Sequence, residues 1–142
     1  MTPPIRKLLI NIDGASLGNP GAAGIGVVVC DARGKILKKI SEPIGAATNN
    51  VAEYTALIRA LQEAASLSPP NRTGLLIRTD SELLQRQFTG EYRVKSPSLR
   101  ELRMQVMALV PLFAEVQLLY VPREENSRAD KLANEAARKV DG

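Results

Sequence analysis

The chain has 142 residues, 44% of them hydrophobic and 24% charged, which fits one folded domain rather than a disordered or fibrous chain. Because there is no histidine and only one cysteine, the composition excludes histidine-activated nucleophiles, HExxH metalloproteases, internal disulfides and zinc sites built from cysteines. The net charge of +4 fits a protein that binds polyanions and an ordinary soluble protein equally well.

The first half of the chain predicts three strands and one long helix. Residues 7–13 form an apolar run that predicts a strand. Segments 21–31 and 36–45 predict two more strands, and the tight turn at 32–35 joins them into an antiparallel arrangement. From residue 50 to residue 67 apolar residues recur at helical spacing, and SPPNRTG stops the helix. The inward stripe of this helix comprises Ala56, Leu57, Ala60, Leu61 and Ala64.

The second half of the chain alternates strands with helices. A short apolar strand at 75–80 precedes a helix at 81–88, whose first serine is well placed as an N-cap. A helix at 96–114 opens with Ser-Pro, and a proline near its end bends or stops it. Residues 115–123 predict the last strand and residues 126–140 the last helix. The expected inward positions of that helix are Leu132, Ala133, Ala136 and Val140.

This order of elements predicts an α/β fold with a mixed five-stranded sheet. The first three strands are joined by short turns and are therefore antiparallel, whereas the last two follow helical crossovers and are therefore parallel. Helices should cover both faces of the sheet. No domain boundary, repeat or low-complexity tract interrupts the pattern, so we expect residues 1–142 to form a single domain.

Two further expectations concern location and the single thiol. No apolar run approaches the ~20 residues that a membrane helix needs, and the segment MTPPIRKLLINID has too short an apolar core for a secretory signal. We therefore expect a cytoplasmic protein that does not enter a membrane. Cys30 ends the apolar run GVVVC, and we expect its side chain to be buried.

Four acidic residues stand where apolar or neutral residues are expected. Asp13 ends the first predicted strand, and Asp80 ends a later one. Helical spacing puts Glu53 on the inward stripe of the long helix and Asp130 beside the inward stripe of the last one. A buried carboxylate is costly unless it is paired, hydrogen-bonded or bound to a metal. A shared site for Mg²⁺ or Mn²⁺, which prefer oxygen ligands, would account for all four residues together.

Each acid also has an ordinary structural explanation when it is taken alone. Asp80 suits a turn after a strand, and Glu53 could pair with a nearby arginine such as Arg78. Asp130 near a helix N-terminus would interact favourably with the helix dipole. A common site remains the more economical interpretation, because these explanations leave the acid inside the first strand without a partner.

Four segments of the chain resemble the signature segments of type 1 ribonuclease H, which cuts the RNA strand of an RNA–DNA hybrid. They are IDGASLGNPGAAGIGVVV, TNNVAEYTALIRAL, IRTDSELL and VPREENSRADKLANEA. The resemblance covers about residues 7–137, in the correct order. It implies the ribonuclease H-like fold and a metal-dependent endonuclease that leaves 3′-hydroxyl and 5′-phosphate ends, with no added hybrid-binding domain.

The resemblance also implies roles for individual residues. The catalytic, metal-binding tetrad maps onto Asp13, Glu53, Asp80 and Asp130, with two Mg²⁺ or Mn²⁺ ions bridged by Asp13. Glu53 and Asp80 would bind one ion and Asp130 the other. The matching substrate contacts are Gly14, Ser16, Asn19, Thr48, Asn49 and Ser81. As alternatives, GNPGAAG is adequate as a turn before a strand, and residues 48 and 49 could cap the long helix.

The chain departs from the family pattern in three places. Many bacterial relatives carry a histidine in the loop before the last helix, for which Arg123 is our expected substitute. Those relatives also have a basic protrusion containing tryptophan, whereas this chain has only GEYRVKSPS, where Tyr92, Arg93 and Lys95 could stack and pair with phosphates. Glu82 stands where the family commonly has glutamine.

Two rival functions stay open at this point. One is a hybrid-binding module that has kept the fold and lost catalysis, although the complete tetrad argues against it. The other is an enzyme of the same fold that cuts DNA or double-stranded RNA. We expect a monomer that binds RNA–DNA hybrids, with double-stranded RNA as an alternative substrate.

Overall fold

The computed structural model describes residues 5–140, so the ends of the predicted domain 1–142 lie outside the described residues. The described part contains five strands, β1 (Arg6–Leu17), β2 (Gly21–Asp31), β3 (Ile36–Ala47), β4 (Thr73–Thr79) and β5 (Glu115–Tyr120). Its α-helices are α1 (Asn49–Leu67), α2 (Glu82–Thr89), α3 (Pro97–Leu109) and α4 (Ser127–Arg138). Short 3₁₀ helices are η1 (Pro70–Arg72), η2 (Val110–Leu112) and η3 (Arg123–Asn126).

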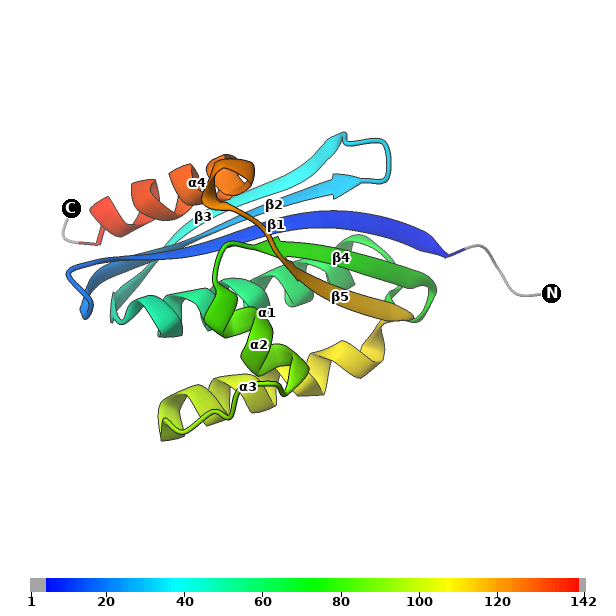
Figure 1. Cartoon of the computed structure of the whole chain (residues 1–142). Coiled ribbons are helices and arrows are strands. Elements are labelled where there is room, and N and C mark those ends of the chain that lie inside the picture. Colours follow the sequence, from blue (N-terminus) through cyan, green and yellow to red (C-terminus); the bar gives the residue numbers. More distant parts are fainter. Residues whose placement is uncertain (1–4, 141–142) are drawn as a thin grey trace.

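The strands form one mixed sheet in the order β3-β2-β1-β4-β5 (Figure 1). β1, β2 and β3 pair in antiparallel fashion, whereas β4 runs parallel to both β1 and β5. The predicted mixed five-stranded sheet is therefore confirmed. β1 is longer than predicted, because its pairing with β2 continues to Leu17 opposite Ala22.

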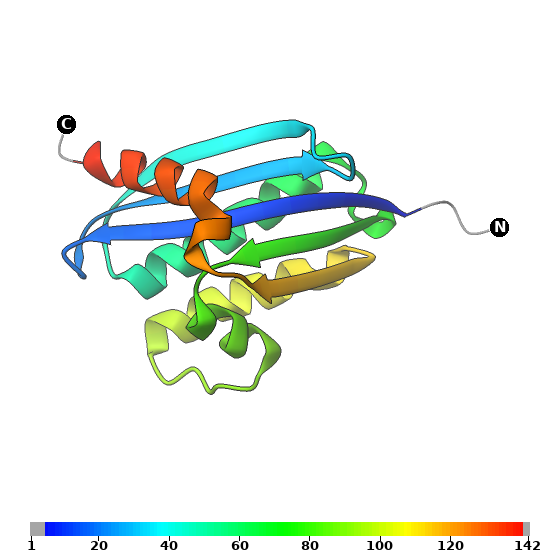
Figure 2. The ribbon, with the colours of Figure 1, turned by 45° about the horizontal axis from the view of Figure 1, so that its top comes forward.

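Helices cover both faces of the sheet, as predicted. α1 packs on one face together with α2 and α3, and α4 packs alone on the other (Figures 1 and 2). On the α1 face, Leu8, Ile10 and Ile12 of β1 are fully buried. They belong to the same core cluster as the α1 stripe, whose five predicted members are all buried. Burial of these large aliphatic side chains is the main stabilising contribution to the fold.

α4 packs closely on the sheet, because small residues meet on both sides. Ala129, Ala133 and Ala136 are fully buried, and they face Gly24 and Gly26 of β2. A Cβ atom on Gly26 would lie 2.2 Å from the carbonyl oxygen of Ala129, which no side-chain movement can relieve. The glycines therefore set the distance between α4 and the sheet.

Replacing Gly26 with alanine is expected to lower the free energy of unfolding by about 1–3 kcal/mol, because the helix must shift away. Gly74→Ala is the matched control, since a Cβ there meets its nearest neighbour at 3.5 Å and the strand conformation is unstrained. That variant should be neutral or slightly stabilising. Urea unfolding of both variants measures the difference, and equal stabilities would contradict the packing described here.

Some predicted burial is wrong at the edges of the α4 layer. Cys30 is only half-buried, because it lines a cavity together with Arg78 and with Ser127 and Arg128 at the start of α4. Leu132 is half-buried beside the buried alanine stripe, and Val140 is half-buried because it lies beyond the end of α4 at Arg138. No helix within residues 5–140 is both long enough and apolar enough to span a membrane.

Candidate active site

The sheet opens where β1 and β4 part. The two strands are paired in parallel only as far as Asn11 and Arg78. Beyond that point β1 continues alongside β2, while β4 ends at Thr79. A crevice at the carboxyl ends of parallel strands is the usual place for a ligand in an α/β sheet. Asp13 lies on β1 beside this opening, and Asp80 follows the last residue of β4.

All four predicted acids line one cavity of about 440 Å³ at this opening, which we call the carboxylate cavity. Asp13, Glu53 and Asp80 each place a carboxylate oxygen within 4.8 Å of the others. Asp13 is 4% exposed and Glu53 is 6% exposed. The structure therefore brings together residues from β1, α1, the end of β4 and α4.

Glu53 is held in place by both of its oxygens. The backbone N–H of Gly14 donates to Oε1 over 2.7 Å, and the Thr79 hydroxyl donates to Oε2 over 3.4 Å. This arrangement requires a glycine at position 14, because a Cβ there would lie 2.3 Å from the carbonyl carbon of Ala52. The alternative pairing of Glu53 with Arg78 is wrong, since Arg78 lines a different cavity with Cys30.

The acids are in an electrostatically unfavourable setting on their own. Burial raises the pKa of Asp13 far above its usual value, and repulsion from Glu53 and Asp80 raises it further. Burial also raises the pKa of Glu53, although the hydrogen bonds from Gly14 and Asp13 oppose the shift. Without a cation, burial and mutual repulsion therefore favour the protonated form of these two acids.

Asp130 approaches the same cavity from the first turn of α4. Its Oδ1 accepts a hydrogen bond from Asn134 Nδ2 over 3.2 Å and lies 3.6 Å from Arg123 Nη2. The segment before α4 is fixed to β1 by the buried Asn126, which donates from Nδ2 to the Ile12 carbonyl oxygen over 2.8 Å. Asp130 therefore lies both near the N-terminus of α4, where the helix dipole favours an acid, and in the lining of the carboxylate cavity.

Five of the predicted substrate contacts line the carboxylate cavity, namely Gly14, Ser16, Asn49, Ser81 and Arg123. Ser81 also caps α2, because its hydroxyl accepts from the Leu84 N–H. Asn19 and Thr48 do not line this cavity. Asn19 Oδ1 accepts from the Asn49 N–H over 2.9 Å, and the Thr48 hydroxyl caps α1.

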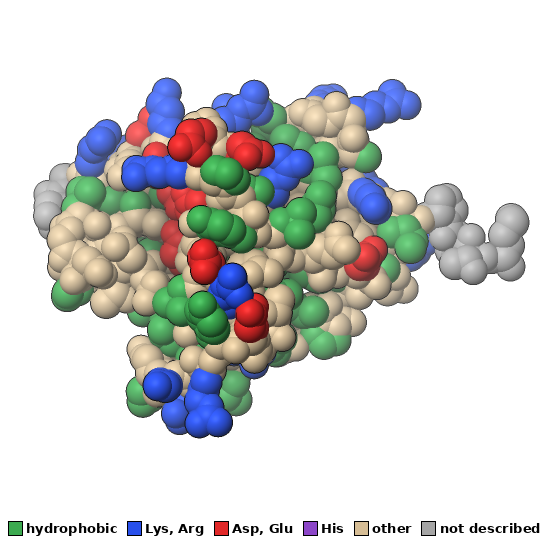
Figure 3. All heavy atoms as spheres, in the orientation of Figure 1, with side chains coloured by type: hydrophobic (Ala, Val, Ile, Leu, Met, Phe, Trp, Pro, Cys, Tyr) green, Lys and Arg blue, Asp and Glu red, His purple; other side chains and the backbone are tan. Residues whose placement is uncertain are grey.

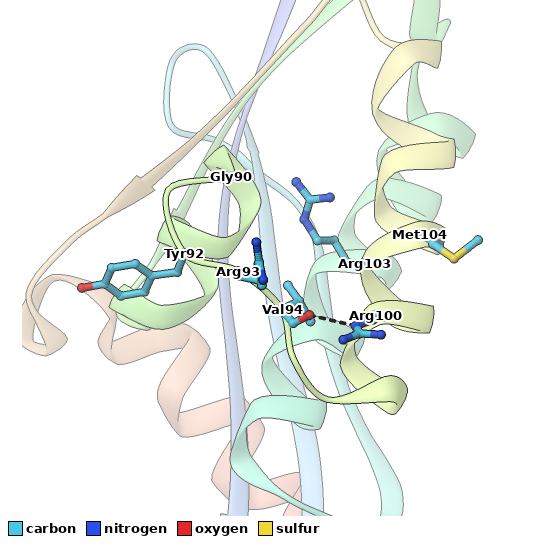
Figure 4. A pocket seen from close by; sticks show the side chains of 7 residues that line it. All are labelled: Gly90, Tyr92, Arg93, Val94, Arg100, Arg103 and Met104. Carbon is cyan, nitrogen blue, oxygen red and sulfur yellow. Dashed lines mark hydrogen bonds between the residues drawn. The ribbon is translucent and has the colours of Figure 1, made fainter.

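The structure does not bring Tyr92 and Lys95 to the carboxylate cavity. They lie in the exposed segment between α2 and α3, where the Arg86 guanidinium lies over the Tyr92 ring at 5.3 Å. Tyr92 lines a separate cavity of about 470 Å³ together with several arginines. Figure 4 shows Tyr92 and Met104 pointing outward from opposite sides of that cavity.

Two polar residues of the cavity were missed by the sequence analysis. Asn50 lines it next to Asn49, and Asn134 lines it one helical turn after Asp130. The spacing of four residues between Asp130 and Asn134 could have indicated Asn134, because it puts both on one helix face. Asn50 carried no signal that separated it from a helix-capping residue.

The donor set fits a divalent cation. Within residues 5–140 no lysine or arginine forms an ion pair with Asp13, Glu53 or Asp80. Buried carboxylates that repel one another and offer only oxygen atoms are a favourable environment for a hard cation such as Mg²⁺. The carboxylate cluster is therefore a possible metal-binding site.

Comparison with known proteins gives the family of the chain. Residues 11–136 match the family model described as "Reverse transcriptase-like". Ribonuclease H from Geotalea uraniireducens is 35% identical over an alignment of 145 positions, which covers 92% of this chain and 93% of that protein. Ribonuclease HI from Halobacterium salinarum is 44% identical over 124 residues, which cover 87% of this chain. The chain belongs to the ribonuclease H family.

Solved structures of ribonuclease H proteins have the same fold as this family member. LC11-RNase H1 in complex with an RNA/DNA hybrid is 42% identical, with a TM-score of 0.89 over 95% of this chain and 99% of that one. The N-terminal RNase H domain of Rv2228c from Mycobacterium tuberculosis is 42% identical, with a TM-score of 0.87, covering 92% and 98% of the two chains. The predicted relationship to type 1 ribonuclease H is confirmed.

The present ribonuclease H chain is shorter than several of its relatives. It spans 61% of the length of the Halobacterium enzyme and 35% of the bifunctional protein Rv2228c. In the latter, the solved N-terminal RNase H domain matches almost all of this chain.

Proposed function

We propose that this ribonuclease H family member is a metal-dependent endonuclease that hydrolyses the RNA strand of RNA–DNA hybrids and leaves 3′-hydroxyl and 5′-phosphate ends. The cluster of Asp13, Glu53 and Asp80, with oxygens within 4.8 Å of one another, carries the proposal. A second support is the likeness to a ribonuclease H1 that was solved with an RNA/DNA hybrid bound.

The four acids of the carboxylate cavity are the residues that would hold two Mg²⁺ or Mn²⁺ ions. Asp13 would bind both ions, Glu53 and Asp80 one of them, and Asp130 the other. When bound, such a pair supplies an activated water and stabilises the leaving oxygen in phosphodiester hydrolysis. The site needs no histidine for this chemistry, which agrees with the composition.

The chain's own residues position these groups and the substrate. The Gly14 N–H and the Thr79 hydroxyl orient Glu53, and the Asn134 side chain orients Asp130. The guanidinium of Arg123 is largely exposed at the mouth of the cavity, where it can pair with a phosphate of substrate or product. We assign to Arg123 the place of the loop histidine of many relatives.

Recognition of RNA would rest on polar groups beside the acids. The Ser16 N–H donates to Asn49 Oδ1 over 3.0 Å, and the Ser16 hydroxyl donates to the Ala47 carbonyl oxygen over 2.7 Å. These groups of Ser16 are thus already used within the protein. The side-chain NH₂ of Asn49 is left as a donor, and we assign to it, with the neighbouring Asn50, the reading of the ribose 2′-hydroxyl.

Cleavage of matched substrates tests the proposal. Duplexes of one sequence are prepared as an RNA–DNA hybrid, as all-DNA and as all-RNA, and the products are resolved on a gel. We expect cutting of the RNA strand of the hybrid only. Cutting of DNA or double-stranded RNA at the hybrid's rate would favour the rival enzymes, and binding of the hybrid without cutting would favour the non-enzymatic module.

Removal of divalent cations is expected to stop cleavage of the hybrid completely. EDTA takes away the cations that neutralise the acids, and excess Mg²⁺ or Mn²⁺ should restore the rate. A chelator selective for Zn²⁺ is the control and should have no effect. Undiminished cleavage in EDTA would contradict the metal-dependent mechanism.

Several finer assignments belong to the same proposal. They are a single domain over residues 1–142, a monomer, a cytoplasmic location, and contacts of Tyr92 and Lys95 with the DNA strand of the hybrid. The last assignment draws on the exposure of both side chains. Because they lie outside the carboxylate cavity, these contacts would be made at a distance from the cleaved bond.

A further inference from the structure

A groove leads away from the carboxylate cavity around the outer side of α4. A concave region of about 380 Å³ shares Arg123, Asp130 and Asn134 with that cavity. A second region of about 430 Å³ shares Lys131 and Glu135 with the first and continues to β3. We call these two regions the α4 groove. They form a continuous path from the acids to the face that α4 and β3 share.

The α4 groove is lined by more cations than acids. Arg138 and Lys131 line the first region, and Lys131, Arg128 and Lys39 line the second, whereas the acids in the lining are Asp130 and Glu135. All four cations are exposed, and within residues 5–140 none of them forms an ion pair. Figure 3 shows Lys and Arg side chains gathered along the upper edge of the molecule, over α4 and the β2–β3 hairpin, with acidic side chains between them. The groove therefore favours an anionic occupant.

The form of the groove favours a single strand over a duplex. The three cations of α4 lie within ten residues of one another, or ~15 Å along the helix axis, so they could pair with roughly three phosphates. No aromatic residue lines the two regions, so they offer no platform on which bases could stack. A duplex is stiff over ~150 base pairs and resists following a path around α4, whereas a single strand bends readily.

We propose that the α4 groove binds the sugar-phosphate backbone of the RNA strand where that strand continues, unpaired, beyond the hybrid. The inference rests on the proposed function, because the RNA strand is the one that would lie at the carboxylate cavity, from which the groove leads. The cations would contact the phosphates and not the bases, so binding would not depend on the RNA sequence.

The experiment compares the affinity for a blunt hybrid with the affinity for hybrids in which one strand is extended. Either the RNA strand carries a 3′ or a 5′ overhang, or the DNA strand carries an overhang. Asp13→Asn protein is used in Mg²⁺ so that the RNA stays intact. We expect an RNA overhang of one polarity to tighten binding. The slope of log affinity against log salt concentration should become steeper by ~2 for three phosphate contacts. The increase in affinity due to the overhang should therefore grow by roughly 20-fold when salt is lowered from about 200 to about 50 mM.

Charge-matched variants test the location of the contact. The triple variant Arg128→Gln, Lys131→Gln, Arg138→Gln should lose the gain from the overhang and keep its affinity for the blunt hybrid. The control Arg6→Gln, Lys7→Gln, Arg72→Gln removes the same charge from exposed positions near the start of β1 and β4, and it should keep the gain.

Three results would overturn the inference: an overhang that gives no gain, a gain that survives in the α4 variant, or an equal gain from a DNA overhang. The proposed function is tested separately: it fails if the unmodified chain does not cleave the blunt hybrid. Melting temperatures of both triple variants establish that the comparison is made between folded proteins.

Discussion

Asp13→Asn is expected to abolish cleavage of the hybrid, by ~10³-fold or more if the lost ligand contributes about 4 kcal/mol to the transition state. Asparagine keeps the shape of the side chain and removes the charge that would hold the cations. Single-turnover cleavage in Mg²⁺ measures the effect. The control Asp31→Asn changes an acid in the β2–β3 turn, where it accepts from the N–H groups of Arg33 and Lys35, and it should cut normally.

The same variant should be at least as stable as the unmodified chain when no divalent cation is present. Asp13 contributes repulsion and a costly burial, both of which raise its pKa, and the substitution removes them. Retention of near-normal cleavage by the folded variant would contradict the role assigned to Asp13. Loss of cleavage together with loss of folding would leave Glu53→Gln as the second test.

Stability in EDTA should fall as the pH rises from 5 to 8. Burial raises the pKa values of Asp13 and Glu53 above their ordinary values of 3.8 and 4.5, so the folded chain binds more protons than the unfolded chain in this window. The free energy of unfolding then decreases with pH. Asp13→Asn should make the decrease smaller, because one of the two groups is gone. Thermal unfolding across the pH range measures both slopes, and a melting temperature that rises equally in both proteins would contradict the expectation.

Cleavage is expected to depend on the ribose 2′-hydroxyl, because both strands offer the same phosphates and cations alone cannot distinguish them. An all-DNA duplex should not be cut. Single 2′-deoxy substitutions along the RNA strand should depress cutting most beside the scissile phosphate, by ~10-fold for one lost hydrogen bond. A strand with a single ribonucleotide should be cut poorly or not at all. The rates of these substrates are measured under single-turnover conditions.

The variant Asn49→Asp tests whether the Asn49 side chain binds the ribose 2′-hydroxyl. The variant keeps an oxygen to accept from the Ser16 N–H but loses the NH₂ donor of a side chain that lines the cavity. It should cut the all-RNA strand more slowly and respond much less to the critical 2′-deoxy substitution. Asn71→Asp in η1 is the control for added charge. An unchanged response in Asn49→Asp would place the recognition elsewhere, and equal cutting of all-DNA duplexes would contradict ribonuclease H activity.

The order and type of the elements could be predicted from the sequence because they depend on local rules. Apolar periodicity identified the five strands and the helices, and Ser81 and Ser96 cap the helices that follow them. The four acids could be singled out for the same reason, since each stands at a position where local pattern predicts burial or a strand end. Glu53 on the inward face of α1 is the clearest of these cases.

What the tertiary structure alone decided is how distant residues meet and which polar groups remain available. Gly14 and Glu53 are 39 residues apart, and their contact exists because α1 approaches β1 where no Cβ stands in the way. The tertiary structure also uses the polar groups of Ser16 within the protein and places Tyr92 outside the carboxylate cavity. Local patterns fix which face of an element a residue occupies. Distances across elements follow from how closely those faces pack, and that depends on side chains from both partners at once.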